Sequence, residues 1–322
     1  MYSRPISSIL VVTMTPQFCL ELVVSGRSIG LKNTPKNLIT QMNKFTADDG
    51  ENLSVKISGS GHPIVMLHGW TSNHAGWGSI PQALSPNHRV FSPDARGHGM
   101  QVLSKNQEPD VKRLARDVLN LLDHYGLEKA AMVGHSMGAL TLWQFIRDFG
   151  CKRFSHLCII DQSPKLVTDE SWQNGIYGNF DAARSQLMLA ELDSNFVETV
   201  LKLIAYGLNS KARVSYDRDS YGWELARKNL LPLDPQPLIA IWKSLVAADY
   251  RDVLSLINVP TLLVWGKESN FYTEATAKYL LTHIKLATSS SYENADHCPQ
   301  LKDPLRFSTE LLKFFACPTA PA

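Results

Sequence analysis

The pentapeptide Gly-His-Ser-Met-Gly at residues 134–138 decides the fold of this chain. It follows the short apolar run 130–133 and precedes a helical pattern that begins at Ala139. A G-x-S-x-G sequence between a buried strand and a helix is typical of a nucleophile elbow, a sharp strained turn that exposes the serine hydroxyl above the sheet. The flanking glycines avoid side-chain clashes in that turn. We therefore expect Ser136 to act as a nucleophile.

Short apolar runs recur on both sides of this pentapeptide. Besides 130–133, they occupy residues 64–67, 157–160 and 261–265, and each is soon followed by Gly, Asp or Ser. Uninterrupted apolar runs of this length are typical of strands that are buried on both faces of a sheet. Residues 52–58 instead alternate between apolar and polar, which predicts a half-buried edge strand.

Helical patterns separate these runs. Residues 111–125 place Leu114, Val118 and Leu121 on one stripe, and residues 140–149 and 304–315 show the same periodicity. Alternating strands and helices predict a mostly parallel sheet with helices on both faces. We therefore expect an α/β fold of the doubly wound class.

Residues 164–248 interrupt this alternation, because they contain no run that resembles a buried strand. We expect several helices here, inserted between two strands as a cap over the strand ends, where ligands bind in open α/β sheets. The core would then comprise residues 42–163 and 249–322. Ligand pockets favour aromatic linings at such seams, so we expect a substrate pocket lined by His135, Trp172, Tyr177 and Trp223. The alternative is a helical decoration without a role in catalysis.

Residues 1–41 differ in composition from the rest of the chain. They contain one acidic and four basic residues, and their apolar run at residues 9–12 is too short for the core of a signal peptide. Met42 opens a strand-like stretch. We expect 1–41 to be an N-terminal extension outside the fold, with a secretion or transit segment as the alternative.

Composition excludes several classes of function. The chain has 322 residues with 44% hydrophobic content, and its net charge of +2 gives no footprint for nucleic acid or an anionic membrane. No segment approaches the roughly 18 apolar residues that span a bilayer. The five cysteines are widely spaced, which favours reduced thiols over a disulfide framework or zinc pairs. We expect a cytoplasmic protein without a metal or cofactor, secreted only if 1–41 is a targeting segment.

Four features in order identify a resemblance. They are His68-Gly69-Trp70 after one strand, the turn at residues 94–99 after the next, the pentapeptide at 134–138 and a late His297. From about residue 50 to 316 the chain resembles the α/β-hydrolase fold superfamily. Within it, the chain is similar to compact serine esterases, lactonases and cofactor-free perhydrolases with a small helical cap.

The resemblance implies the groups that stabilise the oxyanion. In the family, one backbone N–H comes from the loop after the first buried strand and the other from the residue after the nucleophile. In this sequence those residues are Trp70 and Met137. Such donors stabilise the negative charge that builds on the substrate carbonyl oxygen in the transition state.

The resemblance also sets the order of the triad as serine, acid and histidine along the chain. Three histidines follow Ser136, namely His156, His283 and His297. His156 precedes a strand and His283 lies in a helical stretch, whereas His297 lies in a loop near the C-terminus. Catalytic groups are commonly carried by loops at strand ends, so we expect His297 to be the base.

The acid departs from the family pattern. The family usually places an Asp in a G-x-x-D turn after the strand that follows the cap, and here Ser269 occupies that position. Some members place the acid one strand earlier, which corresponds to Asp161. We expect Asp161 to be the acid, with Glu268 as the fallback. A turn or helix cap is the structural alternative for Asp161.

These residues predict a serine hydrolase that cleaves small or medium carboxylic esters or lactones through an acyl-enzyme on Ser136. One alternative is a cofactor-free perhydrolase or oxygenase on the same fold. Another is a non-catalytic receptor for a small ligand. The sequence does not indicate the oligomeric state or the physiological substrate.

Overall fold

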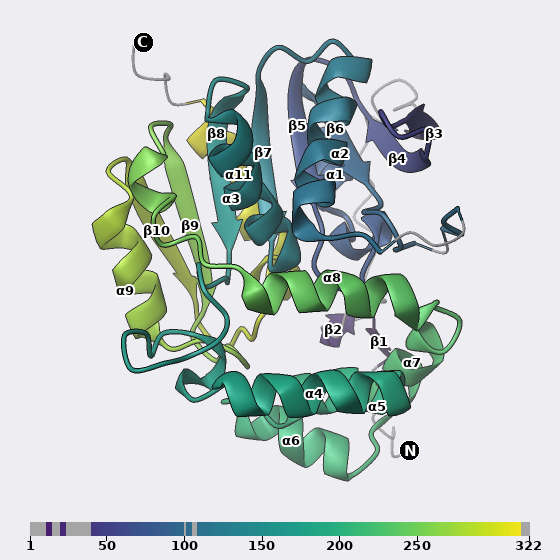
Figure 1. Ribbon diagram of the computed structural model, residues 1–322. Helices are drawn as coiled ribbons and strands as arrows, with labels where there is room; N and C mark the ends of the chain where they lie inside the picture. Colours follow the sequence, from purple (N-terminus) through teal and green to yellow (C-terminus); the bar gives the residue numbers. More distant parts are fainter. Residues whose placement is uncertain (1–10, 15–19, 24–39, 100, 105–107, 317–322) are drawn as a thin grey trace, which may run out of the picture.

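The computed structural model describes residues 11–14, 20–23, 40–99, 101–104 and 108–316. Its centre is an eight-stranded sheet (Figure 1). The strands of this sheet are β3 (Thr40–Thr46), β4 (Asn52–Ser58), β5 (His62–Leu67), β6 (His88–Pro93), β7 (Ala130–His135), β8 (Phe154–Ile160), β9 (Thr261–Gly266) and β10 (Ala287–Tyr292). Their order across the sheet is β10-β9-β8-β7-β5-β6-β4-β3.

The sheet is mostly parallel. Strands β10, β9, β8, β7, β5 and β6 pair in parallel, while β4 is antiparallel to both of its neighbours. The expectation that residues 52–58 form an edge strand is wrong, because β3 pairs with β4 along its whole length and lies at the edge instead. The alternating burial of β4 reflects its position near this edge, where one face of the sheet is less covered.

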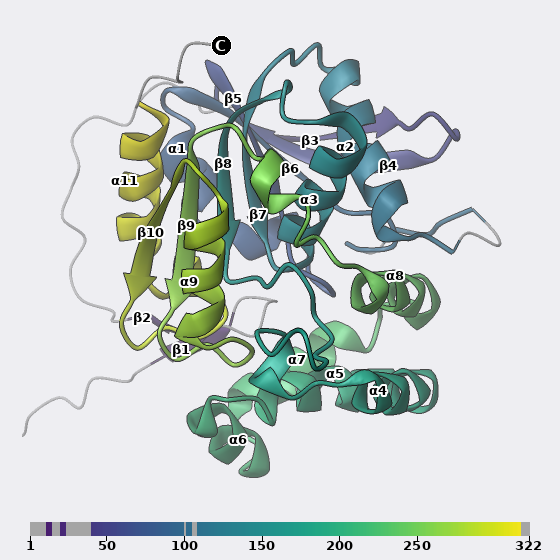
Figure 2. The same ribbon diagram turned by 60° about the vertical axis from the view of Figure 1, so that its left-hand side comes forward.

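Helices cover both faces of the sheet (Figures 1 and 2). One face carries α2 (Val111–His124), α3 (Met137–Phe149) and α9 (Glu274–His283), and the other carries α1 (Ile80–Leu84) and α11 (Pro304–Phe315). Alternate residues of each central strand enter different cores. In β5, Val65 packs in the core beneath α2 and α3, while Ile64 and Met66 pack against α1 and α11.

Five further α-helices lie between β8 and β9 in the chain. They are α4 (Ala182–Ser194), α5 (Phe196–Ala205), α6 (Ser210–Asp217), α7 (Tyr221–Leu230) and α8 (Pro235–Ala247). All views place them together beyond one end of the sheet, across from the carboxyl ends of the parallel strands (Figures 1 and 2). The helices expected between residues 164 and 248 are therefore present, and we refer to α4–α8 as the cap.

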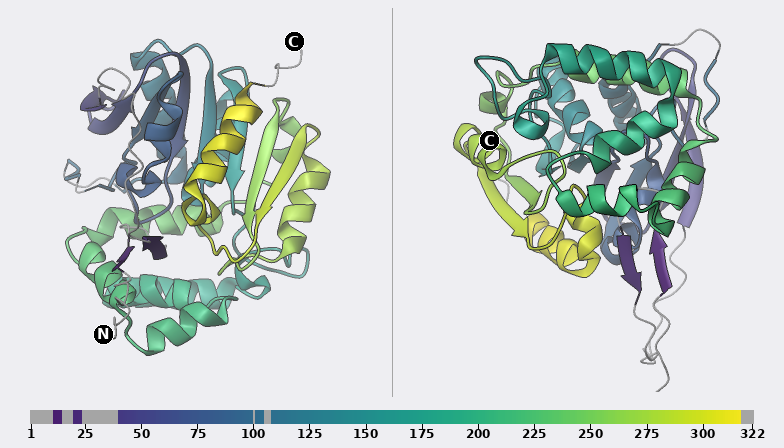
Figure 3. Two further views of the ribbon diagram at one scale, coloured as in Figure 1. Left: turned by 180° about the vertical axis from the view of Figure 1, so that it is seen from behind. Right: turned by 90° about the horizontal axis from the view of Figure 1, so that it is seen from below.

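The described parts of the N-terminal segment form a separate small sheet. Strands β1 (Val11–Met14) and β2 (Leu20–Val23) pair antiparallel, and β1 lies near α7 of the cap (Figure 3). Strand β3 begins at Thr40, so the main sheet starts two residues before the boundary expected at Met42. The division of the chain into an extension, a core and a cap remains a prediction.

None of the helices that the structure describes is both long enough and apolar enough to cross a bilayer.

Candidate active site

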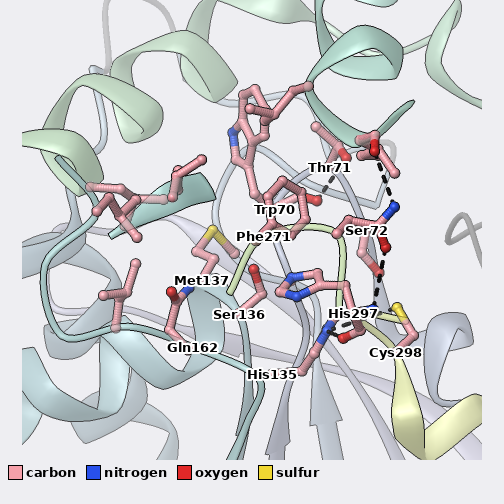
Figure 4. A pocket seen from close by; sticks show the side chains of 18 of the residues that line it. Trp70, Thr71, Ser72, His135, Ser136, Met137, Gln162, Phe271, His297 and Cys298 are labelled. Carbon is pink, nitrogen blue, oxygen red and sulfur yellow. Dashed lines mark hydrogen bonds between the residues drawn. The ribbon is translucent and has the colours of Figure 1, made fainter. Parts of the chain in front are cut away.

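The carboxyl ends of neighbouring parallel strands meet at one edge of the sheet and bring the expected site residues together. Trp70 follows β5, Ser136 follows β7, Asp161 follows β8 and His297 lies in the loop after β10. Trp70, Ser136 and His297 line one cavity between this edge and the cap (Figure 4). Such an edge is where open α/β sheets bind ligands.

Ser136 has the backbone conformation of a strained turn. Its φ is 51° and its ψ is −117°, a region that residues other than glycine rarely adopt. The conformation is held by the Ser136 N–H, which donates to the carbonyl of Ile160 at 3.2 Å. Helix α3 begins at Met137, so the serine hydroxyl stands at the positive end of a helix.

Two glycines allow this turn to pack. A Cβ on Gly138 would lie 2.1 Å from the carbonyl oxygen of Leu67, and a Cβ on Gly134 would lie 2.7 Å from the amide nitrogen of Ala139. Both obstacles are backbone atoms, which cannot rotate away. The helix that follows the serine can therefore approach β5 and β7 closely only because these positions lack side chains.

We expect Gly138→Ala to lower the free energy of unfolding and to reduce any activity that depends on Ser136. An overpacked core position costs about 1–3 kcal/mol, and the shift needed here moves the start of α3. Urea unfolding measures the first effect. The control is Gly126→Asn, since no atom lies within 4 Å of a Cβ there and asparagine tolerates its φ of 62°. Equal stability of both variants would contradict the packing argument.

His297 and Asp161 form a buried pair. Nδ1 of His297 lies 3.3 Å from Oδ2 of Asp161, and the Asp161 side chain is fully buried. Figure 4 shows the Ser136 hydroxyl beside the opposite part of the His297 ring. The three side chains are thus arranged in the order serine, histidine and carboxylate. In this order the histidine can take a proton from the serine while the carboxylate orients the ring and stabilises its cation.

Burial controls the protonation of this pair. It lowers the pKa of His297 to about 4, although the nearby Asp296 carboxylate acts in the opposite direction. Burial also raises the pKa of Asp161 well above its usual range, while the Ser269 hydroxyl opposes that rise. The imidazole is therefore neutral and able to accept a proton. The buried carboxylate has lost its solvation, so a cation on the ring beside it stabilises it strongly.

Three further residues hold the loop that carries His297. Nε2 of His135 bonds the carbonyl of His297 at 2.9 Å, and Oδ1 of Asn270 accepts from the backbone N–H of His297 at 3.4 Å. The Phe271 ring packs edge-on against the imidazole with centroids 4.5 Å apart. Asn270 and Phe271 were not expected from the sequence, and only their place two to three residues after Glu268 could have drawn attention to them.

Glu268 is directed away from His297. Both of its carboxylate oxygens lie 2.7 Å from Nζ of Lys211 on α6, so this side chain joins the core to the cap. Ser269, which stands where the family carries its usual acid, is buried and accepts from the backbone N–H groups of Phe271 and Tyr272 at 3.2 and 3.3 Å. The geometry therefore pairs His297 with Asp161 and not with the fallback.

A buried histidine supports the loop that contains Trp70. Nε2 of His68 accepts from the amide of Ala95 at 3.0 Å, so its Nδ1 carries the proton and donates to the carbonyl of Gly69 at 2.8 Å. Burial lowers the pKa of His68, which keeps it neutral in this arrangement. His68 thus fixes the backbone just before Trp70.

The two residues expected to stabilise an oxyanion both line the cavity. Met137 is the first residue of α3, and amides in the first turn of a helix have no partner within the helix. The Trp70 side chain contacts the cap, because its Nε1 donates to the carbonyl of Leu238 at 2.9 Å and its ring lies 4.6 Å from that of Trp242. This contact ties the loop after β5 to α8.

The cavity is lined differently from what we expected. His135 lines it, but Trp172, Tyr177 and Trp223 do not. Trp172 packs on Tyr279, and Tyr177 stacks behind Phe271 with its hydroxyl bonded to the carbonyl of Leu203. Aliphatic side chains and one tryptophan from residues 164–248 take their place: Leu166, Ile176, Val200, Leu203, Trp242 and Leu245.

A metal site requires several ligand side chains that lie close together. Among the described residues, no three or more His, Cys, Asp or Glu side chains are placed so that they could hold a metal ion.

Comparison with known proteins agrees with this architecture. A family model described as the alpha/beta hydrolase fold matches residues 62–304. The chain is 27% identical over 269 residues to 3-oxoadipate enol-lactonase 1 of Acinetobacter baylyi, which covers 82% of this chain and 92% of the relative. It is 26% identical to a pimeloyl-[acyl-carrier protein] methyl ester esterase of Aeromonas hydrophila, with 82% and 98% covered. The solved structure of an esterase from Exiguobacterium antarcticum superposes with a TM-score of 0.74 at 19% identity and covers 86% of this chain and 100% of that one.

Proposed function

The chain belongs to the alpha/beta hydrolase fold family, and from this premise we propose that it is a serine hydrolase of carboxylic esters or lactones. The observation that carries the proposal is that Ser136 and His297 line one cavity, while the buried Asp161 lies behind His297 with its Oδ2 3.3 Å from His297 Nδ1. Relatives that are named as an enol-lactonase and a methyl ester esterase support the same reaction type.

In the proposed reaction, Ser136 attacks the substrate carbonyl carbon while His297 takes the proton of its hydroxyl. The negative charge that develops on the carbonyl oxygen is stabilised by the backbone N–H groups of Trp70 and Met137. His297 then gives the proton to the departing alcohol, which leaves an acyl group on Ser136. Asp161 orients His297 and stabilises its cation in both steps.

The second half of the reaction releases the acid. Water enters the position that the alcohol has left, and His297 removes a proton from it as it attacks the acyl carbon. The acyl group returns to solution as a carboxylic acid, and Ser136 recovers its proton. For a lactone, alcohol and acid are parts of one molecule and the product is a hydroxy acid.

The cavity wall favours an uncharged substrate. Among the described residues that line it, none is a lysine or arginine, while Asp296 contributes a carboxylate. An unpaired carboxylate of a substrate would lose its solvation there without gaining a partner. We therefore propose neutral esters and lactones with small or medium acyl groups as the substrate class.

The test is a screen of 4-nitrophenyl esters from acetate to decanoate together with neutral aliphatic lactones. We expect hydrolysis of the short and medium esters and a fall in kcat/KM for the longest acyl groups. Tight binding of these compounds without turnover would instead indicate a ligand receptor. Absence of both binding and turnover would contradict the proposed substrate class.

A further inference from the structure

Gln162 is a buried polar residue in the cavity that the reaction scheme does not use. It follows Asp161 directly after β8, its residue is 2% exposed, and it lines the cavity beside Met137 (Figure 4). A buried amide usually has partners for both its oxygen and its nitrogen. The partners of this amide are therefore informative.

Two donors fix the orientation of the amide. The backbone N–H of Ser163 lies 2.7 Å from the Oε1 position of Gln162, and a backbone N–H can only donate, so the atom that faces it is the oxygen. The Tyr272 hydroxyl donates to the same oxygen. Burial and the neighbouring Asp161 raise the pKa of Tyr272 well above its usual value, which keeps this hydroxyl protonated.

The amide nitrogen is left for the cavity. Among the described residues, no hydrogen bond uses Nε2 of Gln162, whereas Oε1 accepts from both the Ser163 N–H and the Tyr272 hydroxyl. The wall around it is largely apolar, including Leu140, Leu166 and Ile176. A donor in such surroundings favours a ligand that brings an acceptor, because a ligand without one leaves the N–H groups unpaired.

We propose that Gln162 is a specificity-determining residue that donates from Nε2 to an acceptor oxygen in the acyl part of the substrate, outside the ester group that reacts. The substrate class is then a neutral ester or lactone whose acyl chain carries an ether, keto or hydroxyl oxygen. This inference rests on the proposed serine hydrolase activity.

Matched substrates test this proposal. Each pair comprises a 4-nitrophenyl alkanoate and the ester of equal chain length in which one methylene, at position 3, 4 or 5 of the acyl chain, is replaced by an ether oxygen. An ether oxygen also changes the intrinsic reactivity of the ester. The quantity of interest is therefore the ratio of kcat/KM for the two members in the wild type, divided by the same ratio in a variant, since intrinsic reactivity cancels.

Gln162→Met removes the donor and keeps the length of the side chain. Gln162→Glu keeps an oxygen for Ser163 and Tyr272 and cannot donate once it is ionised. It serves, at a pH above its own titration, if the methionine variant folds poorly. For at least one ether position we expect both variants to reduce the preference for the ether substrate about tenfold, the scale of one neutral hydrogen bond. Leu203→Met, which alters the same cavity without a polar group, should leave the ratio unchanged.

The outcomes separate this inference from the proposed function. Equal losses of kcat/KM on both members of every pair would overturn the specificity role and would point to support of the oxyanion or of the fold. An unchanged ratio in both Gln162 variants would overturn it as well. Failure of the wild type to hydrolyse any ester would instead overturn the serine hydrolase proposal.

Discussion

Ser136→Ala is expected to abolish ester hydrolysis while the fold persists. Loss of the nucleophile in a serine protease triad reduces kcat on the order of 10⁶-fold, and we expect a loss of that scale here. Alanine keeps the Cβ, so the strained φ of 51° and the packing of α3 against β5 are unchanged. The measurement is turnover of 4-nitrophenyl butyrate together with the thermal unfolding midpoint.

The matched control for this variant is Ser308→Ala. Ser308 lies in α11, its hydroxyl donates to the carbonyl of Pro304, and it is not among the residues that line the cavity. It loses the same atom without touching the site and should keep wild-type turnover. Wild-type turnover in Ser136→Ala would show that another group is the nucleophile.

Asp161→Asn is expected to lower kcat about 10⁴-fold, the loss measured for the corresponding change in a serine protease triad. The amide cannot carry the charge that stabilises the His297 cation. Its NH₂ group can also donate to Nδ1, which favours the tautomer of His297 whose Nε2 is already protonated and cannot accept a proton from Ser136. Asp161 is fully buried and lies 3.3 Å from His297 Nδ1, so water cannot replace the lost charge. Steady-state kinetics on one short ester measure the effect.

The pH dependence of the residual activity gives a second readout. In the wild type, we expect activity to fall when the pair of His297 and Asp161 takes up a proton. Burial raises the pKa of Asp161, so this carboxylate can receive that proton. In Asp161→Asn the proton can bind only His297, whose pKa burial lowers to about 4. The acid limb of kcat/KM should therefore move to lower pH in the variant. If the acid limb of kcat/KM lies at the same pH in the variant and the wild type, protonation of Asp161 does not control the activity.

Glu268→Gln is the matched control for the carboxylate. Its side chain binds Lys211 of the cap, and breaking an exposed ion pair of this kind costs about 0–1 kcal/mol. We expect kcat to remain within a few-fold of wild type. A collapse of kcat in Glu268→Gln with near-normal kcat in Asp161→Asn would transfer the role of the acid to Glu268.

The parts of the fold that the sequence predicts are those with strong local signals. The buried strands and the helices α2, α3 and α11 lie within a few residues of the apolar runs and stripes that indicate them. Strand β10 has the sequence Ala-Thr-Ser-Ser-Ser-Tyr and is largely exposed at the sheet edge, so no apolar run marks it. The expectation of an edge strand at β4 is wrong because half-burial does not distinguish an edge strand from its neighbour.

The residues that line the cavity were less predictable than the positions of Ser136, Asp161 and His297. Ser136, Asp161 and His297 each follow a strand, and parallel strands bring their ends together whatever the intervening sequence is. The cap contributes through helix faces, whose orientation depends on tertiary packing. Aromatic content selected Trp172 and Tyr177, whereas the helical spacing of Val200 and Leu203 in α5 was the more relevant signal.

The acid illustrates how a missing residue can be informative. Ser269 at the usual position excluded the common arrangement, but the sequence alone left Asp161 and Glu268 both open. Only the direction of the side chains separates them, because Glu268 has a cationic partner on α6 that no local pattern around residue 268 reveals. The assignment of Asp161 as the acid accordingly rests on geometry and awaits the two variants.

The central claim is that the reaction proceeds through an acyl group on Ser136. The most direct measurement is intact-protein and peptide mass spectrometry after treatment with a fluorophosphonate, a reagent that reacts with activated serine nucleophiles. We predict one covalent adduct, located on the peptide that contains Ser136, with no adduct in Ser136→Ala and loss of esterase activity in proportion to labelling. An adduct on another residue of the cavity such as Cys298, or full hydrolysis by a protein labelled at Ser136, would contradict the claim.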